Sequence, residues 1–374
     1  MYMPFFPLIA NEFRISDEAV SSTLSTWLLG GATAQIILGP LSDRFGRKIV
    51  LMYGGLLFII SCILCILSTS INLMLIARFL QGVGVCSMMI AGYSCVHEIY
   101  KDKQAIKILA MMSSISILAP MIGPVIGGYL ALFYNWRIVF WVLLLCAIFS
   151  IFSLYFYMPN TQPSSSKSFS KSLSIKSIFC RYINICSNHL FILNVLCFSM
   201  GYACIMLWIS TSPFLLMHGY HMNTYSFGLA QLPVFGAFMV GSKITNYFID
   251  KLLLTKIIKY AFCLTILGLM LLVPSCFLNK VELLIISISI SMIAFGMLTA
   301  PLNRLAFNSS NGDKGITASV FYTFMMGSGA IITKIFGYVE YTTLNFAIVF
   351  CIIAITQILL FSIINGINNI ENEV

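Results

Sequence analysis

The sequence predicts an all-α fold that crosses a membrane many times. Of the 374 residues, 59% are hydrophobic and only 9% are charged, and the mean hydropathy is +0.96. No water-soluble domain of this size has so apolar a surface. The apolar residues also run in continuous stretches, whereas a β-barrel wall needs alternating apolar and polar residues. These observations together predict a polytopic helical membrane protein.

Short polar breaks separate the apolar stretches and set the expected helices. A hydrocarbon core of about 30 Å needs about 20 apolar residues in each helical span. Eleven stretches reach this length, while the first, MYMPFFPLIA, is half a span and predicts an incomplete first helix. The expected spans are residues 1–10, 21–42, 49–69, 72–96, 105–132, 138–158, 189–217, 224–249, 257–278, 282–303, 316–339 and 343–365.

A break rich in Ser and Lys divides the chain near its middle. It predicts an N-terminal helical bundle of residues 1–158 and a C-terminal helical bundle of residues 189–374, joined by a linker of residues 159–188. The composition of this linker is typical of a flexible connection. Two six-span bundles joined in this way form the layout expected of a transporter whose halves rock against each other.

Basic residues are distributed unequally between the breaks. Sixteen of the 21 Lys and Arg residues fall in one alternating set of breaks, and only Arg14, Arg137 and Lys280 fall in the other. Because cytoplasmic loops retain Lys and Arg, we expect the linker and the C-terminus to be cytoplasmic. The net charge of +9 then reflects membrane topology, and it gives no reason to expect a nucleic-acid partner.

The stretch GPLSDRFGRK, residues 39–48, concentrates charge in a chain that has little of it. Gly46 permits a tight reversal of the backbone, and the Asp43 carboxylate can lie at a neighbouring helix N-terminus, where the helix dipole favours anions. Retention of positive charge in the cytoplasm explains the basic residues but not the Asp and Gly spacing. The candidate gating residues are Gly39, Asp43, Arg44, Gly46, Arg47 and Lys48.

Two further motifs lie within spans. RFLQGVG places Arg78 and Gln81 inside a helix, where a buried Arg costs about 2.5–3.5 kcal/mol on insertion scales unless it snorkels to the interface. APMIGPVIGG, residues 119–128, carries glycines four apart on one helical face, which let another backbone approach closely. Its two prolines bend the helix and free backbone carbonyls. The residues of this motif are Pro120, Gly123, Pro124, Gly127 and Gly128.

These motifs, with MYMPFFPLIANEF at the start and NWRIVFW at residues 135–141, resemble the major facilitator superfamily and, within it, the Bcr/CflA type of bicyclomycin and chloramphenicol resistance. The resemblance implies the major facilitator fold. It also implies efflux of drugs or metabolites in exchange for protons, by a monomer without cofactors in the bacterial inner membrane. In that family residues 39–48 would gate transport, Arg78 and Gln81 would serve proton coupling, and residues 119–128 would form the antiporter helix motif.

The sequence departs from that family at its first residues. The family's first-helix pattern begins with an Asp, expected to take up the proton, at a position that here would precede Met1. No Asp or Glu lies near the middle of an expected span, although proton exchange usually needs an embedded acid. Three interpretations stay open: the start lies upstream, the gene is a decayed exporter, or His97, Glu98 or Lys334 takes the proton.

The expected substrate cavity rests on polar and aromatic residues within the spans. Weakly selective exporters bind flat apolar molecules with aromatic and Met side chains, although such residues more often serve packing or face lipid. The candidates are Tyr2, Tyr93, Met112, Tyr202, Met206, Trp208, Gln231, Phe235 and Tyr322. The histidines and cysteines show no metal-ligand spacing, so no metal site is expected.

Competing functions fit single features of the sequence. An importer of a small metabolite would not need the two prolines of residues 119–128, whereas a non-transporting or sensor-like relative would fit the short first helix. An enzyme is not expected, because the spans hold no paired Asp and no HExxH motif. GYSCV at residues 92–96 also lacks the second Gly of a nucleophile elbow.

Overall fold

The protein is helical throughout the part that the computed structural model describes, which is residues 1–374 apart from 100–101, 159–174, 250, 311–313 and 374. The N-terminal half holds η1 Met3–Phe5, α1 Phe6–Phe13, α2 Asp17–Phe45, α3 Arg47–Ile66, α4 Ile71–Ile99, α5 Asp102–Leu130 and α6 Arg137–Tyr157. The rest holds α7 Ile175–Cys186, α8 His189–Pro213, η2 Phe214–Gly219, α9 Thr224–Phe248, α10 Leu254–Leu278, α11 Val281–Asn308, α12 Lys314–Gly337 and α13 Thr343–Glu373. Of the short elements, η1 is a 3₁₀-helix and η2 a π-helix.

The long helices match the spans that the sequence predicts. Within the described residues, nine helices are long and apolar enough to cross a membrane by length and composition. With α2 and α5, which are of similar length, they account for the eleven expected complete spans. The helix α7 was not expected, and it lies inside the segment that the sequence indicates as a linker.

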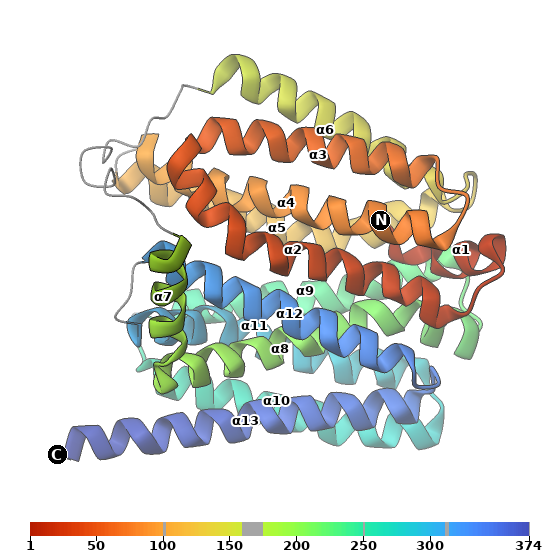
Figure 1. Ribbon diagram of the computed structural model, residues 1–374. Helices are drawn as coiled ribbons and strands as arrows, with labels where there is room; N and C mark the ends of the chain where they lie inside the picture. Colours follow the sequence, from red (N-terminus) through yellow and green to blue (C-terminus); the bar gives the residue numbers. More distant parts are fainter. Residues whose placement is uncertain (100–101, 159–174, 250, 311–313, 374) are drawn as a thin grey trace.

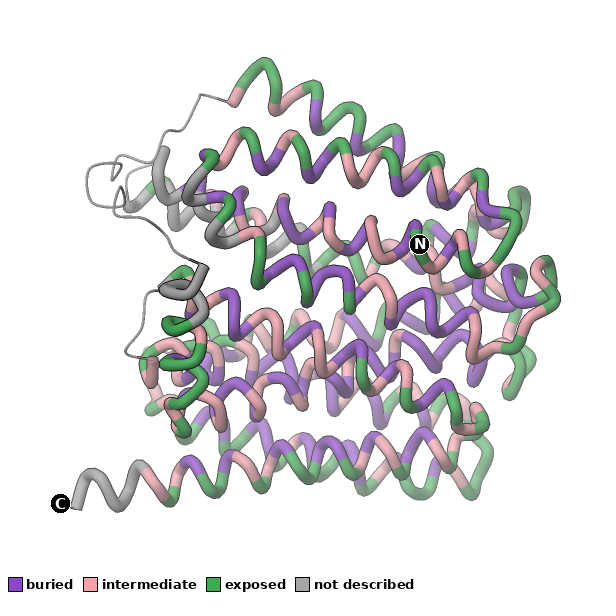
Figure 2. The backbone as a smooth tube through the Cα atoms, in the orientation of Figure 1, coloured by how far each residue is buried: buried purple, intermediate pink, exposed green. Residues whose placement is uncertain are grey.

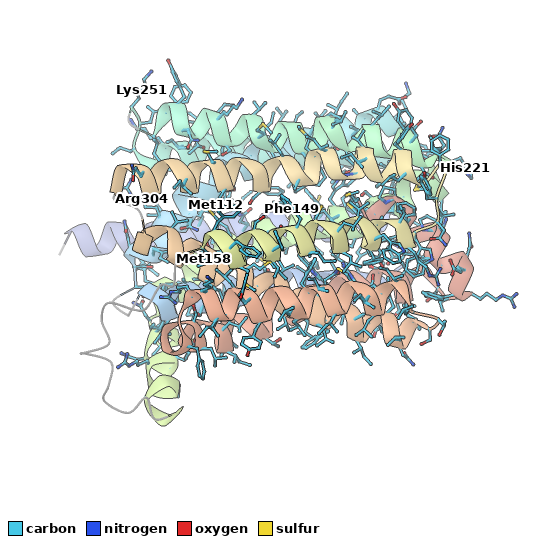
Figure 3. The ribbon with its side chains drawn as sticks, turned by 90° about the horizontal axis from the view of Figure 1, so that it is seen from above. Met112, Phe149, Met158, His221, Lys251 and Arg304 are labelled. Atoms are coloured by element: carbon cyan, nitrogen blue, oxygen red, sulfur yellow. The ribbon has the colours of Figure 1, made fainter. Side chains whose placement is uncertain are left out.

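Figure 1 shows two bundles side by side, one built from α1–α6 and the other from α8–α13. We call the end of the molecule where α6 leads into the linker the linker end, and α7 lies across it against α8 and α12. The other end is the opposite end. Figure 3 shows Lys251 and Arg304 at the linker end and His221 at the opposite end.

Polar caps fix the start of three of the long helices. Ser16, Asn188 and Asn223 precede α2, α8 and α9, and the side chain of each accepts a hydrogen bond from the backbone N–H three residues further on. The donor–acceptor distances are 3.3, 3.1 and 2.7 Å. Such caps satisfy first-turn N–H groups that have no partner within the helix.

The apolar core has two main parts. One fills the C-terminal bundle around the fully buried Trp208. The other, which we call the bridging cluster, joins Phe6, Trp136 and Phe140 of the first bundle to Met206 and Phe214 of the second. Figure 2 shows the buried residues where helices face one another and many exposed residues along α6 and α13. The bridging cluster therefore lies between the two halves.

Two pairs of helices form most of the contact between the bundles, α2 with α12 and α5 with α9. The α5–α9 contact brings backbones together directly. A Cβ atom added at Gly128 would lie 2.6 Å from the carbonyl oxygen of Thr224, and one added at Gly228 would lie 2.7 Å from that of Pro124. Small residues at such contacts allow helices to approach more closely than side chains would permit.

Candidate functional site

The centre of the candidate site is Arg78, about 10 Å along α4 from its start at the rise of an α-helix. Its side chain is only 7% exposed, and its Nη1 donates a hydrogen bond to Oε1 of Gln81. Residues three apart face each other on a helix, so the RFLQGVG spacing produces this pair. Gln81 Nε2 in turn lies 3.3 Å from Cys62 Sγ, while the Nε atom of Arg78 is buried without a partner.

Two aromatic rings flank the Arg78 guanidinium. Its central carbon lies 4.6 Å from the ring centre of Tyr2 and 5.8 Å from that of Trp27. The Tyr2 hydroxyl is fixed by a 2.9 Å hydrogen bond with Thr23 Oγ1. Cation–π contacts are worth about 0.5–2 kcal/mol each. Two of them offset much of the insertion cost of about 2.5–3.5 kcal/mol, so snorkelling is not needed to explain this Arg.

Three of the cavity candidates share the bridging cluster, and one of them, Tyr2, contacts Arg78. Tyr2, Tyr202 and Met206 all belong to or pack against the bridging cluster. Tyr202 and Met206 come from α8 of the second bundle, and both lie close to Gly329 of α12. An apolar, aromatic environment with a few polar groups between two bundles is the usual character of a small-molecule site.

The other cavity candidates lie elsewhere. Trp208 donates its indole N–H to Gln231 Oε1 at 2.9 Å, and both side chains are buried inside the C-terminal bundle with Phe235 beside them in the same core. Tyr322 packs on Phe321 in a smaller cluster. Met112 is half-buried on α5 (Figure 3), and the side chain of Tyr93 lies outside the described residues.

The glycine and proline motif of α5 is packed against two other segments. Gly128 and Pro124 face α9, as described above. Gly123 and Gly127 face the first residues of the chain, because a Cβ at Gly123 would lie 3.0 Å from Met1 N and one at Gly127 would collide with the Met1 carbonyl. The remaining residue, Pro120, is exposed within α5. The backbones of α5, α9 and the residues before α1 therefore meet at this motif.

The described part of GPLSDRFGRK is held within the first bundle. Gly46 ends α2 with φ 91°, a conformation that favours glycine, and gives the tight reversal into α3. Arg47 Nη1 donates to Ser42 Oγ at 2.7 Å. Lys48 donates to the carbonyls of Tyr155 and Met158 at 3.1 and 2.7 Å, where it caps the end of α6. Side chains of the remaining motif residues, Gly39, Asp43 and Arg44, lie outside the described residues.

Among the described side chains, the ion pairs between the bundles lie at the opposite end of the molecule. Asp17 Oδ2 of α2 is 3.3 Å from Nδ1 of His218 in η2, and Glu18 Oε1 is 3.6 Å from Nζ of Lys334 in α12. Lys334 also donates to Ser22 Oγ at 3.0 Å. Lys334 thus joins the bundles, a role that its sequence position did not reveal. Burial raises the pKa of Asp17, which precedes the expected span, and His218 opposes that shift.

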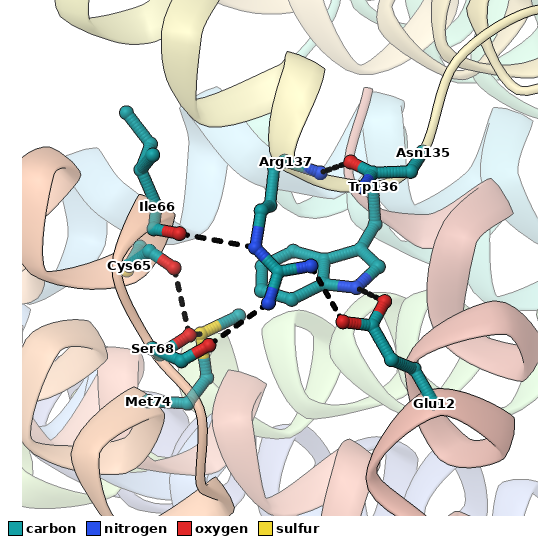
Figure 4. A network of polar contacts seen from close by, with 8 residues as sticks. All are labelled: Glu12, Cys65, Ile66, Ser68, Met74, Asn135, Trp136 and Arg137. Atoms are coloured by element: carbon teal, nitrogen blue, oxygen red, sulfur yellow. Dashed lines mark hydrogen bonds and ion pairs between the residues drawn. The ribbon is translucent and has the colours of Figure 1, made fainter.

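A second polar network at the opposite end ties the first bundle together (Figure 4). Glu12 accepts hydrogen bonds from Arg137 Nη1 and Trp136 Nε1, each at 2.5 Å. Arg137 also donates to the carbonyls of Ile66 and Ser68, both at 3.0 Å. The residues NWR of NWRIVFW therefore connect α1, the α3–α4 loop and α6.

The acidic side chains that the structure describes stay near helix ends, as the sequence indicates. They are Glu12, Asp17, Glu18, Glu282 and Glu340. Among the described residues, no group of three His, Cys, Asp or Glu side chains could hold a metal ion. The candidate site therefore offers a buried cation, its amide partner and aromatic faces.

Two helical bundles that meet along paired helices have the layout of a secondary membrane transporter. The sequence profile described as "Major Facilitator Superfamily" matches residues 1–334. The chain belongs to the Major Facilitator Superfamily, and it is a multi-pass membrane protein. Its family and named relatives are transporters, not enzymes.

Curated relatives cover most of the chain. The chloramphenicol resistance protein CraA of Acinetobacter baumannii is 32% identical over 330 residues, which are 88% of this chain and 79% of CraA. The multidrug transporter MdfA of Yersinia pestis is 30% identical over 85% of this chain and 78% of its own length. The multidrug resistance protein MdtM of Escherichia coli K12 is 31% identical over 85% of this chain and 77% of its own length.

Solved structures agree on the fold. A D-xylose-proton symporter superposes with a TM-score of 0.75 at 14% identity, over 96% of this chain and 93% of that chain. The xylose transporter XylE from E. coli, in a partially occluded inward open conformation, superposes with a TM-score of 0.72 at 15% identity over the same shares. These similarities establish the major facilitator fold that the sequence predicts.

Proposed function

We propose that the protein exports amphipathic drugs or metabolites across the bacterial inner membrane in exchange for protons, as a monomer. The observation that carries the proposal is that relatives 30–32% identical over 85–88% of the chain are named for chloramphenicol resistance and multidrug transport. The paired prolines and glycines of residues 119–128 and the aromatic residues around Arg78 support it.

The proposed cycle is alternating access. The described ion pairs between the bundles lie at the opposite end of the molecule. The positive-inside rule assigns the linker end and the C-terminus to the cytoplasm, so the opposite end would face the periplasm. The arrangement supports a state closed toward the periplasm. Release of Asp17 from His218 and of Glu18 from Lys334 would let that end open, while residues 39–48 would gate the linker end.

Dye accumulation in cells tests the direction of transport. Cells that express the protein should hold less of a fluorescent amphipathic dye than cells with an empty vector, and an uncoupler should remove the difference. An importer of metabolites would leave dye accumulation unchanged. Equal accumulation with and without expression, for a protein shown to be in the membrane, would contradict export of that dye.

Proteoliposomes test the coupling to protons. Addition of a transported drug to vesicles with an imposed pH gradient should produce a proton flux in the opposite direction to the drug. We propose that Arg78 and Gln81 serve this coupling, since they join a buried cation to an amide partner within the described part of α4. Drug flux without proton flux would contradict antiport, and neither flux would favour a non-transporting relative.

A further inference from the structure

The half of α2 nearer the linker end carries a carbonyl that the helix itself cannot satisfy. In an α-helix the carbonyl of Ile36 would accept a hydrogen bond from the N–H of residue 40. That residue is Pro40, which has no N–H. A backbone carbonyl that loses its helical partner needs another donor. Ile36 is 44% exposed, so a donor from a different element can reach it.

The donor is Tyr182 of α7, the helix that lies across the linker end (Figure 1). Its hydroxyl donates to the Ile36 carbonyl at 3.1 Å. The two residues are 146 positions apart in the sequence, so the bond forms only when the linker helix is placed against α2. It therefore connects α7 to the first bundle.

The helix α7 is at the same time fixed to the second bundle. Ile185 is 5% exposed and packs among buried residues of α8, α11 and α12, and the Tyr182 ring packs against the same cluster. Just beyond α7, Asn188 Nδ2 donates to the carbonyl of Ser309, which follows α11, at 2.7 Å. The helix is thus anchored on the second bundle, while the Tyr182 hydroxyl reaches the first.

We propose that Tyr182 is a gating residue of the linker end and that Pro40 is its positioning residue. The Tyr182–Ile36 bond holds α7 across both bundles and limits how far this end opens. Pro40 acts through Ile36, because it leaves that carbonyl available to the Tyr182 hydroxyl. This inference rests on the proposed alternating-access function, and it gives the linker end an uncharged contact between α7 and α2 besides the charged residues of 39–48.

The separation of the bundles at the linker end can be measured on the purified full chain in lipid nanodiscs. Spin labels would be attached to p-acetylphenylalanine in place of Tyr157 and Leu253, which are 86% and 68% exposed on the two bundles. This chemistry spares the exposed cysteines of the chain, which a thiol label would modify. The ratio of long to short distances then reports how often the linker end is open.

Removal of one oxygen atom tests the gate. Tyr182→Phe keeps the ring and loses the hydroxyl, so the ratio of long to short distances should rise about two- to tenfold, which is what one neutral hydrogen bond supports. Tyr53→Phe, at an exposed Tyr of α3, is the matched control and should leave the ratio unchanged. An unchanged ratio in Tyr182→Phe would overturn the proposal.

A second substitution tests the role of Pro40. Pro40→Ala restores an N–H that can bond to the Ile36 carbonyl, so the ratio should rise as it does in Tyr182→Phe. The two substitutions together should raise it no further, because both remove the same contact. Pro274→Ala, at an exposed Pro within α10, is the matched control and should change nothing. A double variant whose effect is the product of the two single effects would show that Pro40 does not act through Ile36.

The two levels of inference fail in different ways. The label distances need no transported substrate, so they test the contact whether or not the protein exports drugs. An unchanged ratio in Tyr182→Phe together with dye efflux from cells would overturn only this gate. A raised ratio without any dye efflux by the unaltered protein would leave the contact in place and overturn export.

Discussion

The two bundles use their buried polar groups differently. The first bundle buries a cation, Arg78, whose Nε lacks a hydrogen bond and whose neighbours are aromatic rings. The second bundle buries a neutral pair, Trp208 and Gln231, inside an apolar core. Gln231 Nε2 is also buried without a hydrogen bond, but an uncharged amide costs far less to bury than a charge does, so Arg78 is the group whose retention points to a task. The comparison indicates that chemistry is concentrated in the first bundle and stability in the second.

The largest expected effect is on the stability of the second bundle. Trp208→Ala should lower the free energy of unfolding by about 3–5 kcal/mol, because it removes a fully buried indole. Trp27→Ala, at the half-buried Trp beside Arg78, is the matched change in the first bundle. It should cost much less stability but weaken binding of aromatic ligands. Denaturant titration of both variants measures the difference, and equal losses would remove the contrast between the bundles.

The buried glutamines sharpen the same contrast. Gln231→Leu leaves the Trp208 N–H without its acceptor and should destabilise by about 1–3 kcal/mol, with little change in transport per folded molecule. Gln81→Leu removes the acceptor of Arg78 and should reduce transport several-fold. Drug efflux normalised to folded protein tests this. A transport loss confined to Gln231→Leu would mean that the functional polar pair is Trp208–Gln231 in the second bundle, not Arg78–Gln81.

At the linker end we expect a smaller effect. Arg47→Ala removes a hydrogen bond to Ser42 worth about 0.5–1.5 kcal/mol, and it should reduce transport about two- to tenfold while insertion stays intact. Arg304→Ala, an exposed Arg on the other bundle, should have no effect. If membrane abundance falls together with activity, Arg47 sets topology instead of gating.

The smallest effect concerns the ion pairs at the opposite end. Exposed pairs contribute about 0.2–1 kcal/mol each. Glu18→Gln should therefore shift the equilibrium only slightly toward a conformation that is open at this end. Spin labels at Leu67 and Leu344, which are 64% and 51% exposed, report that opening as a longer distance. An unchanged distance distribution would show that the pair does not hold this end closed.

The pH dependence of that end follows from its titrating groups. Burial raises the pKa of Asp17, so this carboxyl takes up a proton earlier than an ordinary Asp as pH falls. Protonation removes its negative charge and weakens the pair with His218, so the end should open at low pH. Asp17→Asn should remove this pH dependence and leave the Glu18–Lys334 pair in place, and a label distance that stays constant with pH in the unaltered protein would contradict the prediction.

Local patterns explain what the sequence predicts well. Hydropathy predicts the eleven long spans, since each must match the bilayer by itself. The spacing of Gly46 predicts the reversal between α2 and α3, and the glycines of residues 119–128 predict close backbone contact. These features depend on neighbouring residues, so they need no knowledge of the other bundle.

Contacts between distant residues could not be predicted in this way. Nothing near Asp17 indicates His218, and nothing near Glu12 indicates Arg137, because each pair forms only when helices assemble. Trp208 and Gln231 look like ligand-binding residues in sequence, yet they bond to each other in a core. The helix α7 did leave a signal, since Ile175, Ile178, Tyr182 and Ile185 share one face, and its flanking Ser and Lys residues obscured it.

The contact of Gly123 and Gly127 with Met1 has a consequence for biosynthesis. The groove that receives the residues before α1 is made by α5, which the ribosome synthesises only after four other helices. Residues 1–5 can therefore reach this packed position only after α5 has inserted. The first bundle thus closes late in synthesis and does not assemble helix by helix.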